Sequence, residues 1–252
     1  MQVIDFHAIM NEISLRYEGR LNDMKREFWI RWSAFFLGIA VMAFGIALTI
    51  RAELGIAPWD VLHIGLMLNF GLTVGSWSII VGFFILALSS LLLKSWPKIG
   101  AFFNMLFVGI FIDLYLFLPL IVTPQSFLGK LLMLIAGVLV LGIGMGLYIA
   151  AGLGAGPRDS LMLALTQLTK LKVQYVRFGM ESVVLLIGWL LGGPVFIGTI
   201  IVTVMIGPVA GYTLPFFQKL VSKLIARGEQ YEDFYKRKIR THDYDGVGEK
   251  LR

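Results

Sequence analysis

Six long apolar stretches constrain the fold of this chain more than any other feature of its sequence. They span residues 32–51, 76–95, 99–119, 128–150, 174–193 and 195–215. A helix of about 20 apolar residues is long enough to cross a hydrocarbon core of roughly 30 Å. Charged residues make up 15% of the chain, against about 25% in soluble domains, so lipid must cover much of the apolar surface. The sequence therefore predicts an all-α polytopic membrane protein with about six transmembrane helices.

Two shorter apolar pieces, residues 58–70 and 157–169, begin with a repeated motif. The chain reads LGIAPWD at the start of the first piece and LGAGPRD, 99 residues later, at the start of the second. About 13 residues extend a helix by only about 20 Å, which is too short to cross the membrane. Pro58 and Pro157 suit the first position of a helix, where the missing N–H of proline has no partner to lose. Each motif therefore predicts a re-entrant half-helix, which enters the membrane and leaves on the same side.

The glycines and aspartates of the two motifs have different expected roles. Gly55, Gly154 and Gly156 permit the unusual backbone dihedrals of a chain that enters a tight turn. Asp60 and Asp159 lie two residues after the prolines, beside the free N–H groups and the positive dipole end of each helix. Each carboxylate could simply cap its own helix. Alternatively, the two helix starts face each other near the midplane, the dipoles favour an anionic group, and the aspartates bind a cation or a proton.

The motifs belong to a longer internal repeat. The segment GIAVMAFGIALTIRAELGIAPWD aligns with GVLVLGIGMGLYIAAGLGAGPRD at an offset of 99 residues. The pattern predicts two membrane repeats, residues 32–119 and 128–215, each with three spans and one half-helix. Because three is an odd number, the second repeat must be inverted relative to the first. Inverted repeats with broken helices are typical of transporters.

The distribution of basic residues favours the same topology. With the N-terminus in the cytoplasm, the segments expected inside hold Lys94, Lys98, Arg158, Lys170, Lys172 and Arg177. The segments expected outside hold Arg51 and Lys130. Cytoplasmic loops of membrane proteins carry an excess of Lys and Arg. The sequence therefore favours six spans over eight and predicts that both termini are cytoplasmic.

Both ends of the chain are polar. Residues 1–31 show apolar side chains at spacings of three and four, which predicts a cytoplasmic amphipathic helix at the membrane surface or, alternatively, a helix that binds a partner. Residues 216–252 form a basic cytoplasmic tail that holds nine Lys and Arg side chains. Contact with anionic lipid explains this tail, so no nucleic-acid partner is predicted.

The two Gly-x-x-Pro-x-Asp motifs, together with the segments FVGIFIDL and MIGPVAGY that follow them, resemble the YczE/YyaS/YitT family of bacterial integral membrane proteins. The likeness covers roughly residues 32–218. It implies a multi-pass protein of the bacterial plasma membrane. Arg158 stands in the second motif where Trp59 stands in the first, so the two halves need not do the same job.

Four further side chains are candidates for binding a substrate or an ion. His63 shares a helix face with the aspartate of the first motif and could form a proton-responsive pair with it, or simply face headgroups or another helix. Arg158 could neutralise the aspartate that follows it or bind an anion. Asp113 is expected to line a cavity or pair with a base, because a carboxylate is costly in lipid. Glu181 could pair with Arg177 or lie on a substrate pathway.

Several classes of function are not supported by the sequence. The chain has no Cys, and its three histidines are too scattered to predict a metal site. No nucleophile elbow, zinc-protease motif or phosphate-binding loop is present, so no enzymatic activity and no cofactor are predicted. The favoured hypothesis is a small-molecule or ion transporter with its site near the paired half-helix starts. The alternative is a non-transporting membrane scaffold or regulatory subunit that assists a partner enzyme, and a homo-oligomer is also compatible with the sequence.

Overall fold

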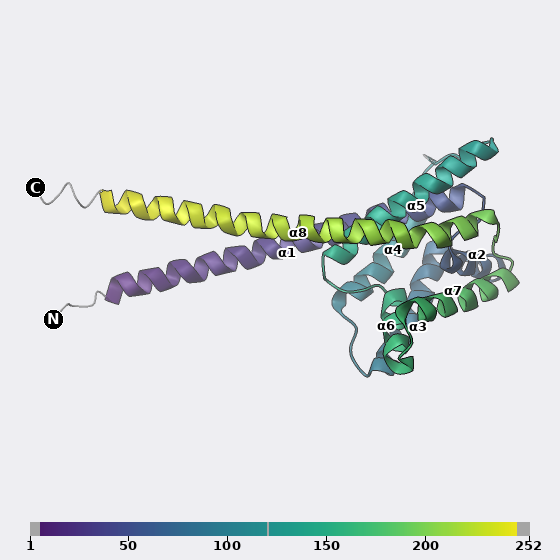
Figure 1. The fold of residues 1–252 in the computed structure, drawn as a ribbon, viewed down its shortest axis with the longest axis horizontal. Helices are drawn as coiled ribbons and strands as arrows, with labels where there is room; N and C mark the ends of the chain where they lie inside the picture. Colours follow the sequence, from purple (N-terminus) through teal and green to yellow (C-terminus); the bar gives the residue numbers. More distant parts are fainter. Residues whose placement is uncertain (1–5, 120, 246–252) are drawn as a thin grey trace, which may run out of the picture. The chain divides into compact units, whose positions relative to one another are not determined.

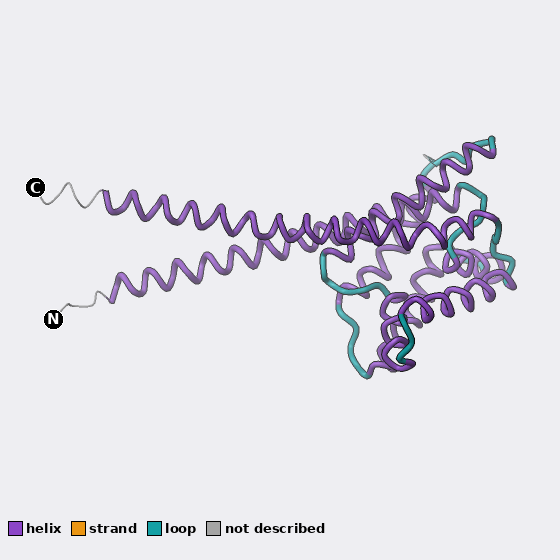
Figure 2. Tube along the Cα trace, in the orientation of Figure 1, coloured by secondary structure: helices purple, strands orange, loops and turns teal. Residues whose placement is uncertain are grey.

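A computed structural model describes residues 6–119 and 121–245, and within this part it describes side chains for residues 24–119 and 121–226. The described chain contains eight helices and no strand (Figures 1 and 2). The helices are α1 (Phe6–Arg51), α2 (Pro58–Phe70), α3 (Val74–Leu93), α4 (Ile99–Phe117), α5 (Phe127–Ala150), α6 (Pro157–Thr169), α7 (Val173–Leu190) and α8 (Ile197–Asp245).

Six of the described helices are long and apolar enough to cross a membrane, which confirms the predicted fold class. The corresponding segments are Met24–Arg51, Val74–Leu93, Ile99–Phe117, Phe127–Ala150, Val173–Leu190 and Ile197–Ala226. Four of them agree with the expected stretches to within three residues at each end, whereas the first begins eight residues earlier and the last ends eleven residues later than expected. The chain is therefore an all-α polytopic protein whose environment is a lipid bilayer.

The chain divides into two compact units. One comprises the described parts of residues 1–33 and 219–252, and the other comprises residues 34–218. The boundaries expected at residues 31 and 216 both fall inside continuous helices, since α1 and α8 run through them without a break. The amphipathic pattern expected for residues 1–31 and the basic side chains of the tail lie mostly outside the part for which side chains are described.

The two short helices have the bounds that the sequence predicts. α2 and α6 contain 13 residues each and begin at Pro58 and Pro157. The chain reaches them through Gly55, with φ of +98°, and Gly154, with φ of +147°, both in the region that favours glycine. Gly156 differs from expectation, because its φ of −64° suits any residue. At Gly156 the requirement is space, since an added Cβ would lie 2.7 Å from the Oδ1 atom of Asn104.

The helices pack in reciprocal pairs. α2 packs against α7, and α6 packs against α3, so each short helix contacts the span that follows the other short helix (Figure 1). α1 and α5 cross through glycines: a Cβ added to Gly38 would meet the carbonyl oxygen of Gly144, and one added to Gly45 would meet that of Gly137. The residue order along the two helices is opposed at this crossing. Two inverted repeats related by a two-fold axis would make contacts of this kind. The inverted arrangement itself, and the re-entrant path of α2 and α6, stay predictions.

The loops that lead into α2 and α6 are held by close backbone contacts. The N–H of Gly198, at the start of α8, donates to the carbonyl oxygen of Leu54 at 2.7 Å. At the equivalent place in the other half, a Cβ on Gly100 would lie 2.5 Å from the carbonyl oxygen of Leu153. The start of each short helix is therefore fixed against the last long helix of the other half. These contacts set the position of the polar side chains described next.

Candidate functional site

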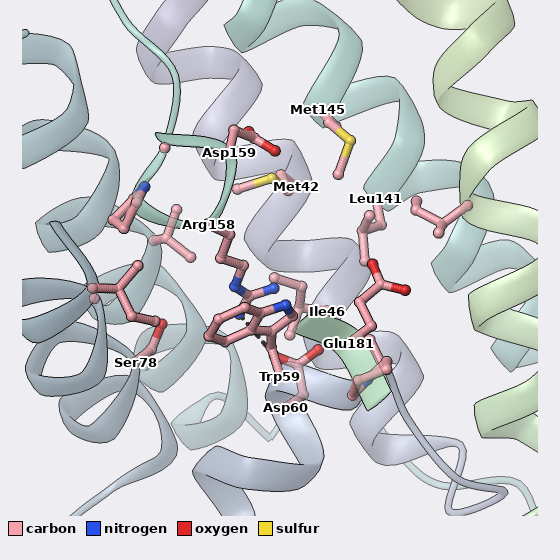
Figure 3. A pocket seen from close by; sticks show the side chains of 18 of the residues that line it. Met42, Ile46, Trp59, Asp60, Ser78, Leu141, Met145, Arg158, Asp159 and Glu181 are labelled. Carbon is pink, nitrogen blue, oxygen red and sulfur yellow. Dashed lines mark ion pairs between the residues drawn. The ribbon is translucent and has the colours of Figure 1, made fainter. Parts of the chain in front are cut away.

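A cavity of about 140 Å³ lies among the helices and is lined by the starts of both short helices, α2 and α6 (Figure 3). All eight described helices contribute side chains to its wall. A single water needs only about 10–15 Å³ of such volume, so the cavity has room for a small solute. The sequence candidates that line it are Pro58, Asp60, His63, Pro157, Arg158, Asp159 and Glu181. The structure thus brings together seven of the eight polar and proline candidates, and Asp113 is the exception.

Asp60 is at the centre of the charged cluster. Its carboxylate Oδ1 lies 3.6 Å from a guanidinium nitrogen of Arg158 and 3.7 Å from Nδ1 of His63. Figure 3 shows the Arg158 side chain reaching to Asp60 and Trp59. The Arg158 guanidinium carbon stands 5.1 Å from the centroid of the Trp59 ring, which places a cation over an aromatic face. The start of α6 is thereby joined to the start of α2 by an ion pair.

This ion pair differs from the one expected at the sequence level. Arg158 was expected to neutralise Asp159, its neighbour in the chain, or to bind an anion. Within the described residues its ion-pair partner is Asp60, which belongs to the other short helix. At the start of a helix, consecutive side chains point in directions about 100° apart, so Arg158 and Asp159 diverge. The pairing depends on how the two short helices meet and not on sequence neighbours.

Neither motif aspartate caps its own helix by a hydrogen bond. The N-cap residues are Ala57 and Gly156, and no side-chain cap bond is formed at either helix start. Both carboxylate oxygens of Asp60 are buried without a hydrogen-bond partner among the described residues. The capping alternative is therefore wrong for Asp60. A buried carboxylate that faces a cavity with no hydrogen bond is costly, and such groups mark functional sites in membrane proteins.

Asp159 has a different environment. Its Oδ2 accepts a hydrogen bond of 3.0 Å from the hydroxyl of Tyr148 on α5. No Lys, Arg or His side chain in the described part of the chain lies within 4 Å of its carboxylate. The aspartates of the two motifs are thus not equivalent: one is paired with a guanidinium, and the other is bound by a phenol.

Glu181 forms the intrahelical pair that the sequence offered as one interpretation, and its place on a substrate pathway stays a prediction. Nε of Arg177 donates to Oε1 of Glu181 at 2.9 Å, four residues along α7, as expected for an intrahelical ion pair. Both side chains also line the cavity. The pair therefore supplies one positive and one negative group to the cavity wall.

Two further polar side chains face the cavity with atoms that lack hydrogen-bond partners in the described chain. They are Nδ1 of His63 and Nδ2 of Asn104, on side chains that are almost completely buried. His63 therefore does not face headgroups, which was one of its two expected environments. Together with Asp60, these residues give the cavity donors and acceptors that are available to a solute.

Sequence reasoning missed part of the lining. Tyr148, Trp59 and Asn104 were not proposed as site residues, although all three lie in the wall. Five methionines also line it: Met42, Met105, Met145, Met162 and Met180. Tyr148 could have been found, because it is a polar aromatic in the same span that leads to the second motif. The methionines carry no positional signal, but their flexible thioethers allow a wall to adapt to a ligand.

Asp113 lies outside the cavity. Its Oδ1 accepts from the backbone N–H of Gly75 at 2.8 Å, and its Oδ2 accepts from the hydroxyl of Thr73. Thr73 is the N-cap of α3. Contrary to expectation, Asp113 therefore neither lines this cavity nor pairs with a base among the described residues: the carboxylate on α4 accepts from one of the free N–H groups and from the N-cap hydroxyl at the start of α3. Its cost in the membrane is offset by these contacts.

A metal centre is not evident in the described residues, where no group of three or more His, Cys, Asp or Glu side chains converges. The polar groups of the cavity are instead chiefly two carboxylate–guanidinium pairs, one carboxylate bound by a tyrosine, one histidine, one amide and the hydroxyls of Ser78 and Thr203. Such a set can bind a charged or zwitterionic solute by hydrogen bonds and ion pairing.

Six apolar helices around a cavity lined by buried polar groups define a multi-pass integral membrane protein with a solute-sized internal site. The chain belongs to a family of unknown function, DUF6198, whose sequence profile matches residues 29–215. This match includes both short helices and all or most of each of the six apolar helices.

The chain has relatives in bacteria, one of which is described as a membrane protein. It is 45% identical over 206 residues to "Uncharacterized membrane protein YczE" of Bacillus subtilis, covering 81% of this chain and 94% of the relative. It is 30% identical over 195 residues to "Uncharacterized protein YyaS" of the same organism, covering 77% and 95%. The expected resemblance to the YczE/YyaS group is confirmed. No solved structure matches the chain.

Proposed function

We propose that this protein is a small-molecule or ion transporter of the bacterial plasma membrane, with its substrate site in the cavity between the two half-helix starts. One observation carries the proposal. The cavity is lined by the starts of both α2 and α6, and its wall contains polar atoms of Asp60, His63 and Asn104 that have no hydrogen-bond partner in the described chain. Transporter sites typically lie where broken helices of two repeats meet. A purely structural cavity would be expected to satisfy its polar groups internally.

The charges of the cavity favour a solute or a coupling ion that is positive. Asp60, Asp159 and Glu181 supply three carboxylates, and Arg158 and Arg177 supply two guanidinium groups. With the lining histidine neutral, the wall carries one excess negative charge. Asp60 lies 3.6 Å from the guanidinium group of Arg158, and Glu181 lies 2.9 Å from that of Arg177. The excess charge therefore resides on Asp159, where a bound cation or proton would neutralise it.

The contact between the two halves supports a transport cycle. The ion pair of Arg158 and Asp60 and the stacking of Arg158 on Trp59 cross from one short helix to the other. In alternating access, one repeat rocks against the other around a fixed site. A pair at 3.6 Å, longer than a hydrogen bond, is a contact that such a movement could open and re-form.

Purified protein in liposomes tests the proposal. Concentration jumps of NaCl, KCl and ethylammonium chloride across proteoliposomes on a solid-supported membrane should evoke a current with at least one cation, and protein-free liposomes should give none. Asp159→Asn should abolish this current. Glu53→Gln should leave it intact, because Glu53 pairs with Lys130 outside the cavity.

Two results would overturn the proposal. One is the absence of flux for every cation tested, in liposomes that contain folded, correctly inserted protein. The other is a current that is unchanged in Asp159→Asn. Either result would favour the alternative of a scaffold or regulatory subunit. That alternative has one observation of its own, since the described parts of residues 1–33 and 219–252 form a separate compact unit that a partner could bind.

A further inference from the structure

A second hollow lies against α6 and α7. It is a groove of about 450 Å³. The residues that line it are Trp59, Leu161, Leu165, Thr169, Leu171, Tyr175, Val176, Gly179, Met180, Val183 and Val184. None of these is charged, and the polar groups among them are the hydroxyls of Thr169 and Tyr175 and the Trp59 indole N–H. The groove is therefore apolar along most of its length.

The groove adjoins the polar cavity. Trp59 and Met180 belong to the walls of both hollows. On α6, Asp159 and Met162 line the cavity, whereas Leu161 and Leu165 line the groove. The same helix thus presents a charged end to one hollow and an apolar face to the other.

α7 is divided in the same way. It offers Arg177 and Glu181 to the cavity, and Val176, Gly179 and Val183 to the groove. The side chain of Val183 is 58% exposed, so this wall of the groove is open along a segment that is apolar enough to span the membrane. A molecule dissolved in the lipid could therefore reach the groove from the side.

We propose that the substrate is a single-chain amphiphile with an ammonium end, whose charged end lies in the cavity beside Asp159 and whose aliphatic chain lies in the groove. This inference rests on the proposed function and specifies its substrate class. The excess negative charge of the cavity selects the cationic end, and the apolar groove selects the chain. Trp59 and Met180 form the boundary that the molecule crosses, and a flexible thioether beside an aromatic ring is a suitable wall for methylene groups.

Gly179 offers a way to fill the groove without disturbing the fold. A Cβ added to Gly179 would meet no heavy atom within 4 Å, and its φ is not positive. Gly179→Leu therefore adds an aliphatic side chain at the wall of the groove with no backbone strain and no clash at its Cβ. Gly211→Leu is the matched control, because a Cβ there also meets nothing within 4 Å and Gly211 lines neither hollow.

The experiment measures equilibrium binding of tritiated n-octylammonium and ethylammonium to the full-length protein in phosphatidylcholine nanodiscs. Protein-free nanodiscs correct for partition into lipid, which is the same for every variant. We expect Gly179→Leu to weaken octylammonium binding at least tenfold, and Gly211→Leu to bind as the wild type does. Ethylammonium should bind equally well to all three proteins, because it has no chain to place in the groove. Octane-1-sulfonate should not displace octylammonium.

The outcomes separate this inference from the proposed function. The role of the groove would be overturned if Gly179→Leu left octylammonium binding unchanged, or if Gly211→Leu reduced it equally. Neither result would contradict the proposed cation site. If octane-1-sulfonate displaced tritiated octylammonium as efficiently as unlabelled octylammonium does, the inference that the site requires a cationic end would be wrong. Binding of both amines that is indifferent to Asp159→Asn would refute the cation site on which both proposals depend.

Discussion

Removal of the Arg158 guanidinium should destabilise the fold more than removal of the charge of Asp60, its partner. The Asp60 side chain is 1% exposed, and apart from Arg158 its nearest ionisable neighbour is His63 at 3.7 Å. The Arg158 side chain is 36% exposed and also stacks on Trp59. In Arg158→Met the buried carboxylate of Asp60 loses its cationic partner. In Asp60→Asn the guanidinium of Arg158 is partly exposed to solvent and still stacks on the ring of Trp59.

The magnitude follows from the burial of the two partners. Breaking a fully buried ion pair by removing one member costs about 3–5 kcal/mol, and the exposure of Arg158 places Arg158→Met at the lower end, about 3 kcal/mol. Asp60→Asn should cost about 1 kcal/mol, since the remaining charge is partly solvated. The double variant leaves neither member of the pair without its partner, so it should cost about 2 kcal/mol. Additive effects would cost about 4 kcal/mol, and the difference is a coupling free energy of about 2 kcal/mol.

The assay is reversible unfolding of the purified protein by SDS in mixed micelles, followed by tryptophan fluorescence. Lys130→Met is the control, because it breaks the pair with Glu53, whose side chain is 60% exposed. An exposed pair of this kind contributes about 0–1 kcal/mol. If Arg158→Met were no more destabilising than Asp60→Asn, or if the two substitutions were additive, the two half-helix starts would not be joined by this pair and the reasoning would fail.

Three further predictions concern the backbone and the topology. In the same unfolding assay, Gly55→Val should destabilise the protein by more than about 2 kcal/mol, because a β-branched residue is strained at φ of +98° and its Cβ would lie 2.7 Å from the hydroxyl of Thr199. Gly207→Val is the control and should cost far less, because a Cβ added at Gly207 meets no heavy atom within 4 Å. Gly38→Ala should cost about 1–3 kcal/mol, because the added Cβ would lie 2.4 Å from a backbone nitrogen on α5, and a neutral effect would argue against the helix crossing. A cysteine at Leu72, in this chain without Cys, should react with an impermeant maleimide from the outside of intact cells; reaction from the cytoplasmic side alone would rule out the six-span topology with cytoplasmic termini.

The sequence alone determined the elements of the fold. The six spans follow from local composition, because the transfer of about 20 apolar residues into lipid depends on those residues and on no distant partner. The short helices α2 and α6 begin at Pro58 and Pro157 because proline at the first position is a local signal that needs no tertiary context. Family membership was likewise contained in the two motifs and the order of the segments that follow them.

Tertiary structure decided which side chains meet. Asp60 and Asp159 occupy equivalent places in the two motifs, yet one pairs with Arg158 and the other with Tyr148. Asp113 was expected at a cavity, but the packing of α4 against α3 brings it to the start of α3. A repeat fixes the spacing of residues along the chain and leaves open the directions in which side chains point once helices cross. Those directions depend on close packing between distant segments, such as the glycine contacts of α1 with α5, and these contacts place the polar groups around one cavity.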